Sequence, residues 1–273
     1  MKTSKYISKQ PNETGRVQYT DEENIIWSEL FHRQLQIIEN RGCSEYIQGI
    51  GHLGLSNQIP QIPEVNHRLR NLTGWEIVPV PALINYERFF KLLADRKFPC
   101  ATFIRTREEM DYLQEPDIFH EVFGHCPLLT IPVYADFMAT YGKIGANADP
   151  KNHAMLARLY WFTVEFGLIQ TKQGLRVYGG GILSSKGETV YALESKQAIR
   201  KSLDVIDAFR TPYRIDIFQP VYFVINSFKE LFDLVQIDLI AAIEKARSLG
   251  MHAPLFPPKE KEESDEESGF KTC

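Results

Sequence analysis

Two apolar segments that contain acids and histidines constrain the fold of this chain most strongly. Residues 116–125 read Pro-Asp-Ile-Phe-His-Glu-Val-Phe-Gly-His, and residues 160–168 read Tyr-Trp-Phe-Thr-Val-Glu-Phe-Gly-Leu. A carboxylate in an apolar core is costly unless it is paired or binds a metal. We therefore expect the fold to bring His120, His125 and Glu165 together.

The residue types in this set indicate which metal would bind. Two neutral imidazoles and one carboxylate suit non-haem Fe(II) and leave coordination positions open for O2, water and a reducing co-substrate. A structural zinc site would instead be closed by four protein ligands. Cys126 follows His125 and could supply a thiolate, but a packed thiol suits an apolar segment better. The pattern predicts an iron site that activates oxygen.

The spacing of the two histidines limits how they can meet. They are five positions apart, which places them about 140° from each other around an ideal α-helix. Gly124 lies between them, and Pro127 disfavours helical backbone at the residue before it. We expect the helix to end near His125, so that its ring can turn back toward His120.

Two other kinds of protein would give part of this pattern. A zinc-dependent hydrolase would use Glu121 as the base, but its two histidines should be four apart, and position 124 is glycine. A non-catalytic helical interaction protein would carry the histidines and Glu165 as ordinary buried residues. The sequence favours the iron site and leaves both alternatives open.

Composition narrows the classes of protein. The 273 residues suffice for one large domain, and 12% are aromatic, which is ample for a core and the lining of a pocket. The formal net charge of -4 without a basic stripe argues against nucleic acid as a partner. The four cysteines show no disulfide spacing, and we see neither a secretory signal nor a membrane-spanning run. We expect a reduced, cytoplasmic protein without a membrane partner.

The chain divides into three parts. Residues 1–19 are polar and predict a flexible lead-in, residues 20–254 predict one domain, and residues 255–273 predict an acidic, disordered tail. Between Lys259 and Lys271 six acids face three lysines, so most of the net negative charge lies in the tail.

Periodicity and capping signals predict a mainly α fold with a few short strands. Thr20 and Glu23 form a capping box that opens a helix ending at Arg41-Gly42. Further helices are expected over 45–53, 64–72, 86–95 (capped by Asn85), 133–146, an uninterrupted 152–170, and one continuous final helix from a cap at Asn226 to Gly250. Strands are expected over 75–80, 101–105 and 176–178, the last leading into a tight passage at 179–181.

Four segments of this chain resemble the catalytic domain of the pterin-dependent aromatic amino acid hydroxylases, most of all its single-domain bacterial members. They are P-D-I-F-H-E-V-F-G-H (116–125), Y-W-F-T-V-E-F-G-L (160–168), Y-G-G-G-I-L-S-S-K-G-E (178–188) and F-Q-P-V-Y-F (218–223). The resemblance extends over most of the chain between about residues 20 and 251.

The resemblance implies a basket-like, mainly α-helical catalytic domain that holds Fe(II) through His120, His125 and Glu165. It implies O2 and a tetrahydropterin, tetrahydrobiopterin or a relative, as co-substrates. The implied reaction passes through a peroxypterin and a ferryl oxo species that attacks an aromatic ring.

The resemblance also implies roles for residues around the metal. Arg105 would pair with the α-carboxylate of the substrate, and Glu188 would anchor the network on the substrate side. The substrate pocket would further include Pro116, Trp161, Phe166, Gly181 and Ser184. The pterin would stack on Phe89, contact the backbone of Ala82, Leu83 and Ile84, and lie near Glu121, with Tyr160 close to the iron.

Two positions indicate which ring is hydroxylated. Tryptophan hydroxylases carry phenylalanine at the position of Trp161, and tyrosine hydroxylases carry aspartate at the position of Ile215. An apolar residue suits an unsubstituted ring better than a phenol, whose buried hydroxyl would need a partner. We therefore expect L-phenylalanine to be converted to L-tyrosine, with tyrosine or tryptophan hydroxylation as the alternatives within the family.

The chain departs from the animal enzymes in three respects. Residues 85–88 read Asn-Tyr-Glu-Arg where the animal enzymes have Ser-Ser-Arg-Asp, and Pro99 replaces a histidine. Both departures lie on the side expected for the pterin. The sequence also leaves no room for the regulatory domain or the tetramerising helix, so we expect a monomer or homodimer and not the animal-type tetramer.

Overall fold

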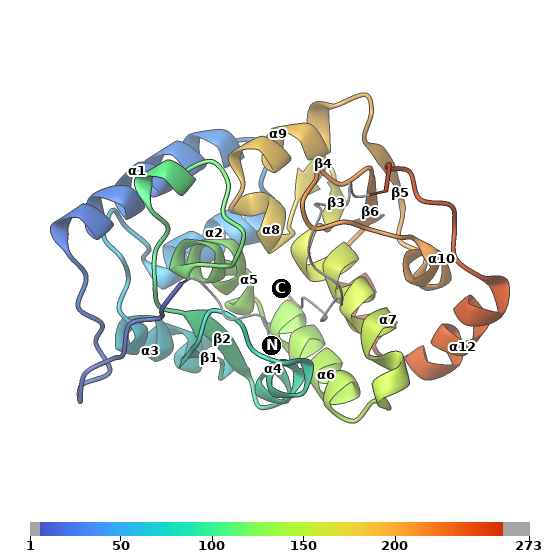
Figure 1. The fold of residues 1–273 in the computed structure, drawn as a ribbon, viewed down its shortest axis with the longest axis horizontal. Helices are drawn as coiled ribbons and strands as arrows, with labels where there is room; N and C mark the ends of the chain where they lie inside the picture. The colour runs from blue at the N-terminus through green and yellow to red at the C-terminus, as the bar shows by residue number, and fades with distance from the viewer. Residues whose placement is uncertain (1–5, 259–273) are drawn as a thin grey trace.

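Helices surround a centre made of short irregular turns in the computed structural model, which describes residues 6–258 (Figure 1). The predicted tail lies outside the described residues from position 259 onward. The helices are α1 (Asp21–Ile38), α2 (Ser44–Leu53), α3 (Ile62–Thr73), α4 (Tyr86–Ala94), α5 (Cys126–Leu129), α6 (Pro132–Ala146), α7 (Pro150–Tyr160), α8 (Gly180–Leu183), α9 (Lys186–Glu194), α10 (Val205–Arg210), α11 (Phe228–Leu234) and α12 (Leu239–Leu249).

Three further turns and two small sheets complete the fold. A 3-10 turn, η1, covers Arg107–Glu109, and two π-helical turns are η2 (Phe119–His125) and η3 (Trp161–Glu165). Strands β1 (Glu76–Val80) and β2 (Lys97–Ala101) form a parallel pair. The second sheet has the order β4-β3-β6-β5 and consists of β3 (Leu168–Thr171), β4 (Gly174–Val177), β5 (Ile199–Ser202) and β6 (Val221–Ile225). The predicted mainly α class with a few short strands is confirmed.

Local signals placed several elements correctly. Thr20 caps α1 with the predicted capping box, in which its side chain accepts from the backbone N–H of Glu23. The Asn85 side chain caps α4 by accepting from the backbone N–H of Arg88. Each cap satisfies a backbone donor that the first turn of a helix leaves without an intrahelical partner.

Three predicted elements were wrong. The strand expected over 101–105 is β2, which ends at Ala101 because its partner β1 ends opposite, at Val80. The helix expected over 152–170 ends at Glu165, and residues 168–171 form a strand instead. The single final helix is two helices, because the Asp238 side chain accepts from the backbone N–H of Ala241 and starts α12 anew.

The segment before α1 has no helix or strand but packs on the body. The Tyr6 ring stacks on Phe103 at 4.7 Å between centroids, and its hydroxyl donates to Glu109 over 2.5 Å. The Tyr19 hydroxyl donates to the carbonyl of Thr102 over 2.9 Å. These contacts hold the stretch that leads from β2 toward η2.

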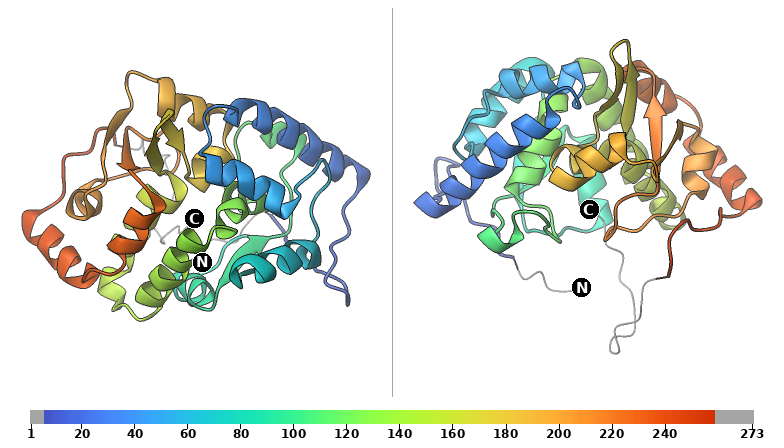
Figure 2. Two further views of the ribbon diagram at one scale, coloured as in Figure 1. Left: turned by 180° about the vertical axis from the view of Figure 1, so that it is seen from behind. Right: turned by 90° about the horizontal axis from the view of Figure 1, so that it is seen from above.

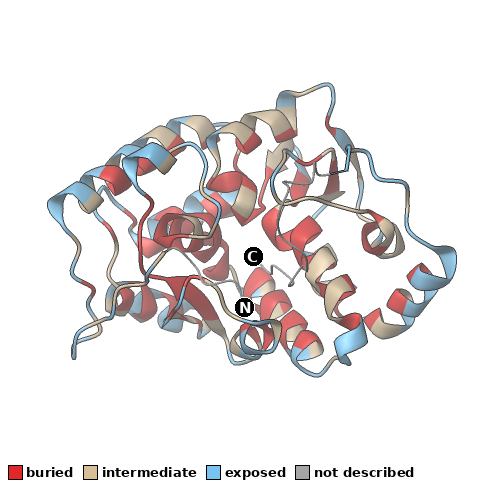
Figure 3. Cartoon of the chain, in the orientation of Figure 1, coloured by how far each residue is buried: buried red, intermediate tan, exposed pale blue. Residues whose placement is uncertain are grey.

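The two π-helical turns lie at the centre of the fold. Turn η2 contacts α1, α5, α8 and β2, and η3 contacts α7, α8 and β6. The turned views place α1 to α3 on one side and α7, α10 and α12 on the other (Figure 2). Each of these helices contains buried residues, which are coloured red in Figure 3. Within residues 6–258, no single helix is long and apolar enough to cross a membrane, although one pair, bent by 113°, has the length and composition.

Helices α4 and α6 approach each other closely at Gly142. A Cβ atom at this position would lie 2.4 Å from the backbone nitrogen of Ala94. We predict that Gly142→Ala lowers the free energy of unfolding by about 1–3 kcal/mol, because the helices must separate to admit the methyl group. Gly51→Ala is the matched control: no atom lies within 4 Å of the added methyl, so it should stabilise α2 by up to ~1 kcal/mol. Urea unfolding that shows equal effects for both variants would refute the close packing.

Candidate active site

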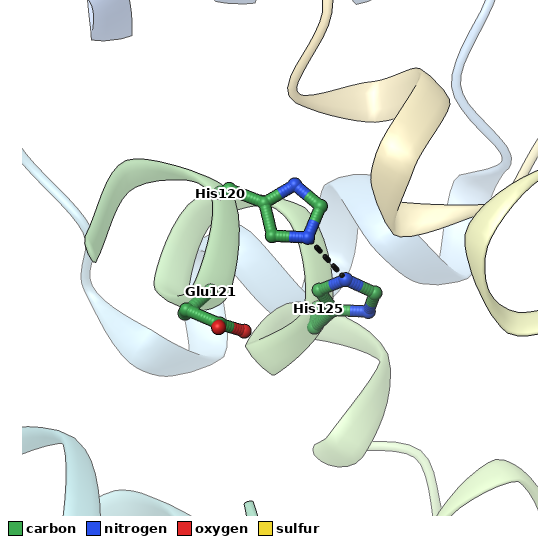
Figure 4. A group of neighbouring side chains, drawn as sticks. All are labelled: His120, Glu121 and His125. Carbon is green, nitrogen blue, oxygen red and sulfur yellow. Dashed lines mark hydrogen bonds between the residues drawn. The ribbon is translucent and has the colours of Figure 1, made fainter. Parts of the chain in front are cut away.

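The π-helical form of η2 explains how two histidines five positions apart meet. In a π-helix each N–H bonds to the carbonyl five residues earlier, so residues five apart lie above each other on one face. The rings of His120 and His125 face each other, with 3.1 Å between their Nε2 atoms (Figure 4). The turn ends at His125 and brings its ring to His120, as predicted, but the backbone stays helical because α5 follows directly at Cys126.

Glu165 reaches the same point from η3. Its Oε2 lies 3.3 Å from Nε2 of His125 and 3.7 Å from Nε2 of His120. Ligands at 2.0–2.2 Å from a metal and at right angles to each other would be ~3 Å apart. The three atoms therefore fit one ion with a two-histidine, one-carboxylate ligand set. The predicted convergence of these three residues is present.

A second carboxyl group, that of Glu121, also lies within 4.8 Å of the two histidines (Figure 4). The two acids differ in how readily they ionise. Burial raises the pKa of Glu121 well above its usual value, and the nearby Glu165 and Asp117 raise it further. Burial also opposes ionisation of Glu165, but His125 and His120 outweigh it and lower the pKa of Glu165. Glu165 therefore ionises more readily than Glu121, which favours Glu165 as the third ligand.

The tautomer of His120 follows from its neighbour Ser184. The Ser184 hydroxyl donates to the carbonyl of Gly180 over 2.9 Å, so it accepts from Nδ1–H of His120, 3.0 Å away. The Nε2 lone pair of His120 then points at the shared site, as a ligand requires. Burial lowers the pKa of His120 to about 4, which keeps the ring neutral. Ser184 was predicted to line the substrate pocket, and in the structure its hydroxyl contacts the His120 ring.

The predicted glycine passage packs directly on the metal-facing residues. A Cβ on Gly180 would lie 2.4 Å from the His125 ring, and one on Gly181 would lie 3.0 Å from Oε2 of Glu165. The N–H of Gly181 also hydrogen-bonds the Glu165 carboxylate. Nδ1 of His125 is buried and has no hydrogen-bond partner in the part of the chain that the structure describes. Packing against Gly180 and the Phe98 ring, 5.1 Å away, orients His125 instead.

Arg105 lies beside the metal-facing residues in a buried ion pair. Its Nε and Nη2 donate to the two carboxylate oxygens of Asp117 over 2.8 and 2.9 Å, and both side chains are at most 7% exposed. Asp117 also accepts from the backbone N–H of His120 over 3.0 Å. Asp117 therefore fixes both the guanidinium and the start of η2. The motif contained Asp117, but no role was predicted for it. Its burial among apolar neighbours was the available signal.

The other predicted residues form two aromatic groups. Phe89 contacts Tyr160 edge to face at 5.2 Å, and the Trp161 ring lies against Phe166 at 4.4 Å. Both groups flank η3, because Tyr160 and Trp161 are consecutive. Ala82 is buried in a small cluster with Ala101 and Phe103. Three other predicted residues, Leu83, Ile84 and Pro116, are half-buried. Glu188 lies in a buried hydrogen-bond network with Gln219 and Tyr222. Gln219 received no predicted role.

The fold and the site together indicate a non-haem metal enzyme, because three ligands of these types would leave one face of a bound ion open. Residues 2–249 match the family described as biopterin-dependent aromatic amino acid hydroxylase. The chain belongs to this family, and the family predicted from the four segments is confirmed.

Sequence relatives and solved structures agree with this assignment. The chain is 55% identical to phenylalanine-4-hydroxylase of Pseudomonas aeruginosa over 95% of this chain and 99% of the relative. It is 50% identical to the Vibrio cholerae enzyme of the same name, over 95% and 90%. The apo structure of the cold-active phenylalanine hydroxylase from Colwellia psychrerythraea superposes with a TM-score of 0.91 at 51% identity, covering 94% of this chain and all of the other. A Chromobacterium violaceum phenylalanine hydroxylase structure with bound iron(III) and 7,8-dihydrobiopterin gives a TM-score of 0.85 at 41% identity, over 92% and 91%.

The buried pair of Arg105 and Asp117 leads to a stability prediction. Asp117→Leu should lower the free energy of unfolding by about 3–5 kcal/mol, because it leaves a buried guanidinium without its counter-charge. The double variant Arg105→Leu/Asp117→Leu should lose less than the single variant. Denaturant unfolding of both variants measures the difference.

An exposed pair provides the control. Arg33 and Asp111 are 2.6 Å apart, and the Asp111 side chain is 71% exposed. Asp111→Ala should therefore cost less than ~1 kcal/mol. A double variant of the buried pair that is less stable than Asp117→Leu would contradict the account.

Glu188 gives a prediction on pH. Burial raises its pKa to about 7, although Gln219 and Tyr222 hydrogen-bond it. Between the unfolded pKa and about 7 the folded state binds more protons, so rising pH lowers the stability of the wild type. Relative to Glu188→Gln, the wild type should lose up to ~3 kcal/mol between pH 4.5 and 8. Thermal unfolding across this range measures it, and a constant difference would contradict the burial of an ionisable Glu188.

Proposed function

We propose that this chain hydroxylates L-phenylalanine to L-tyrosine with iron, O2 and a tetrahydropterin. The convergence of two imidazole nitrogens and one carboxylate oxygen within 3.7 Å carries the proposal. The names of the relatives support the choice of substrate, and the iron(III) and dihydrobiopterin bound in the Chromobacterium violaceum enzyme support the choice of metal and cofactor.

His120, His125 and Glu165 would hold the iron. Iron, pterin and O2 together supply the oxidising chemistry, while the protein binds and orients the reactants and excludes water. With Fe(II) bound, two neutral imidazoles and the single negative charge of Glu165 would leave the site with a net positive charge. Ser184 would keep the Nε2 lone pair of His120 directed at that ion.

The substrate would be held by its charge at one end and by its ring at the other. Asp117 occupies Nε and Nη2 of Arg105. No hydrogen bond to the described residues 6–258 occupies the remaining N–H groups of the guanidinium, which would bind the α-carboxylate of the substrate, a task that the planar geometry suits. Trp161, Phe166, Pro116, Gly181 and Ser184 would form the wall around the ring.

The pterin would stack on Phe89 and lie along the backbone of 82–84, with Tyr160 toward the iron. Glu121 lies beside the histidines with its carboxyl proton retained. A neutral carboxyl group can donate a hydrogen bond to the pterin ring where a carboxylate could only accept one.

The proposal also covers the assembly and cellular location of the protein. We propose a cytoplasmic monomer or homodimer without a nucleic-acid or membrane partner. Cys43, Cys100 and Cys126 are buried free thiols, which suits a reducing compartment.

Turnover and iron binding test the proposal together. Purified protein given L-phenylalanine, O2 and a tetrahydropterin should form tyrosine only when Fe(II) is present. Removing a hydrogen-bond partner of a metal ligand typically lowers metal affinity roughly 10–100-fold. Glu165→Gln changes a ligand itself, so its iron affinity should fall by at least that factor. Glu121→Gln should retain iron and most of its pterin affinity, because the amide can still donate a hydrogen bond.

Three results would contradict the proposal in distinct ways. Oxidation of pterin without tyrosine formation would move the substrate to tyrosine or tryptophan. Loss of iron from Glu121→Gln, but not from Glu165→Gln, would show that Glu121 and not Glu165 is the third metal ligand. Absence of bound iron and of pterin consumption would return the hydrolase and the non-catalytic protein to consideration.

A further inference from the structure

Gln219 connects three parts of the substrate side and uses every polar group of its side chain. It is 1% exposed and lies just before β6. Its Oε1 accepts from the indole Nε1–H of Trp161 over 3.1 Å. Its Nε2 donates to the carbonyls of Arg214 and Ile217 over 2.7 and 3.0 Å. Its backbone N–H donates to Glu188 over 3.0 Å.

The two carbonyls bound by Gln219 flank Ile215. Ile215 is one of the two positions that indicate which ring is hydroxylated, and Trp161 is the other. One side-chain amide therefore joins both positions into a single unit. An indole N–H that is buried needs an acceptor, so the acceptor sets how the Trp161 ring is turned.

Other contacts hold the same loop, which consists of residues 211–218. Tyr213 stacks on Trp161 with 4.8 Å between ring centroids and 23° between planes. Arg214 is fixed on the outside by Asp216, over 2.8 Å, and by the carbonyl of Pro257, over 3.0 Å. Because the loop is held at these points, loss of the Gln219 amide should release Trp161 and the 214–217 carbonyls without detaching the whole loop.

We propose that Gln219 is a positioning residue that sets the substrate ring through Trp161 and Ile215, and thereby the preference for phenylalanine. The inference rests on the proposed function, because it concerns the ring that this function hydroxylates. Gln219 acts through its neighbours and takes no part in the chemistry itself. A ring held loosely meets the oxidant in fewer productive orientations, and small misplacements cost large factors in rate.

The first test compares Gln219→Met with the wild type. Methionine keeps the volume of glutamine but provides neither the acceptor nor the donor. The kcat/KM for phenylalanine should fall about tenfold, and the preference for phenylalanine over tryptophan should narrow by a similar factor. The amount of tyrosine formed per tetrahydropterin oxidised should fall to roughly half, while the KM for pterin stays within about twofold.

The second test needs no turnover. The chain has three tryptophans, so the three indole N–H signals can be resolved by NMR and that of Trp161 assigned with Trp161→Phe. Hydrogen exchange at this N–H should be slow in the wild type and about tenfold faster or more in Gln219→Met. Gln219→Glu keeps an oxygen acceptor for the indole, so it should retain slow exchange and most of the coupling between pterin oxidation and tyrosine formation.

A buried amide elsewhere provides the matched control. Asn66 is 8% exposed and makes two hydrogen bonds with the backbone of Ile77, over 2.7 and 3.0 Å. Asn66→Leu should lose stability as Gln219→Met does, but it should keep the substrate preference and the coupling of the wild type.

Several outcomes would overturn the inference. One is that Gln219→Met keeps the substrate preference and the tyrosine yield per pterin oxidised of the wild type. Another is that Asn66→Leu loses both as Gln219→Met does. A third is that Gln219→Glu gives as little tyrosine per pterin oxidised as Gln219→Met although its Trp161 N–H exchanges slowly. Absence of tyrosine from the wild type would overturn the proposed function instead. In that case the exchange rates would still show whether Gln219 fixes the indole.

Discussion

The structure depends on three polar atoms that face one point inside an apolar core. Nε2 of His120, Nε2 of His125 and Oε2 of Glu165 lie 3.1–3.7 Å from one another. When both imidazoles present Nε2 lone pairs, these lone pairs and the carboxylate oxygen repel each other, and a bound cation would remove that repulsion. The surrounding elements meet this demand: two π-helical turns aim the side chains, and Gly180 and Gly181 leave space for them. The surrounding helices cover these three side chains.

Buried charge is balanced pair by pair around this point. Arg105 and Asp117 neutralise each other, and Asp117 also binds the backbone at the start of η2. Asp117 therefore supports both Arg105, which we expect to receive the substrate carboxylate, and the turn that carries the two proposed histidine ligands. On the opposite side, Gln219 joins Trp161 to the loop of Ile215 without any charge. Under the proposed function, the substrate would lie between an ion pair at one end and neutral hydrogen bonds at the other.

Local signals in the sequence predicted much of this fold and site. The capping box at Thr20 and the cap at Asn85 could be predicted because they depend on near neighbours. The convergence of His120, His125 and Glu165 could be predicted from the cost of burying polar groups. The π-helical turns could not, because the spacing was judged against an α-helix, in which residues five apart do not share a face. The end of β2 depends on its partner strand. Asp117 and Gln219 act through partners distant in sequence, so their roles required the structure.

The most direct measurement is anomalous diffraction at the iron absorption edge from crystals of the protein grown anaerobically with Fe(II). The account predicts one peak about 2.0–2.2 Å from Nε2 of His120, Nε2 of His125 and a carboxylate oxygen of Glu165. A peak bound to Glu121 in place of Glu165, a peak next to the Cys126 sulfur, or no peak between the two imidazoles would contradict it.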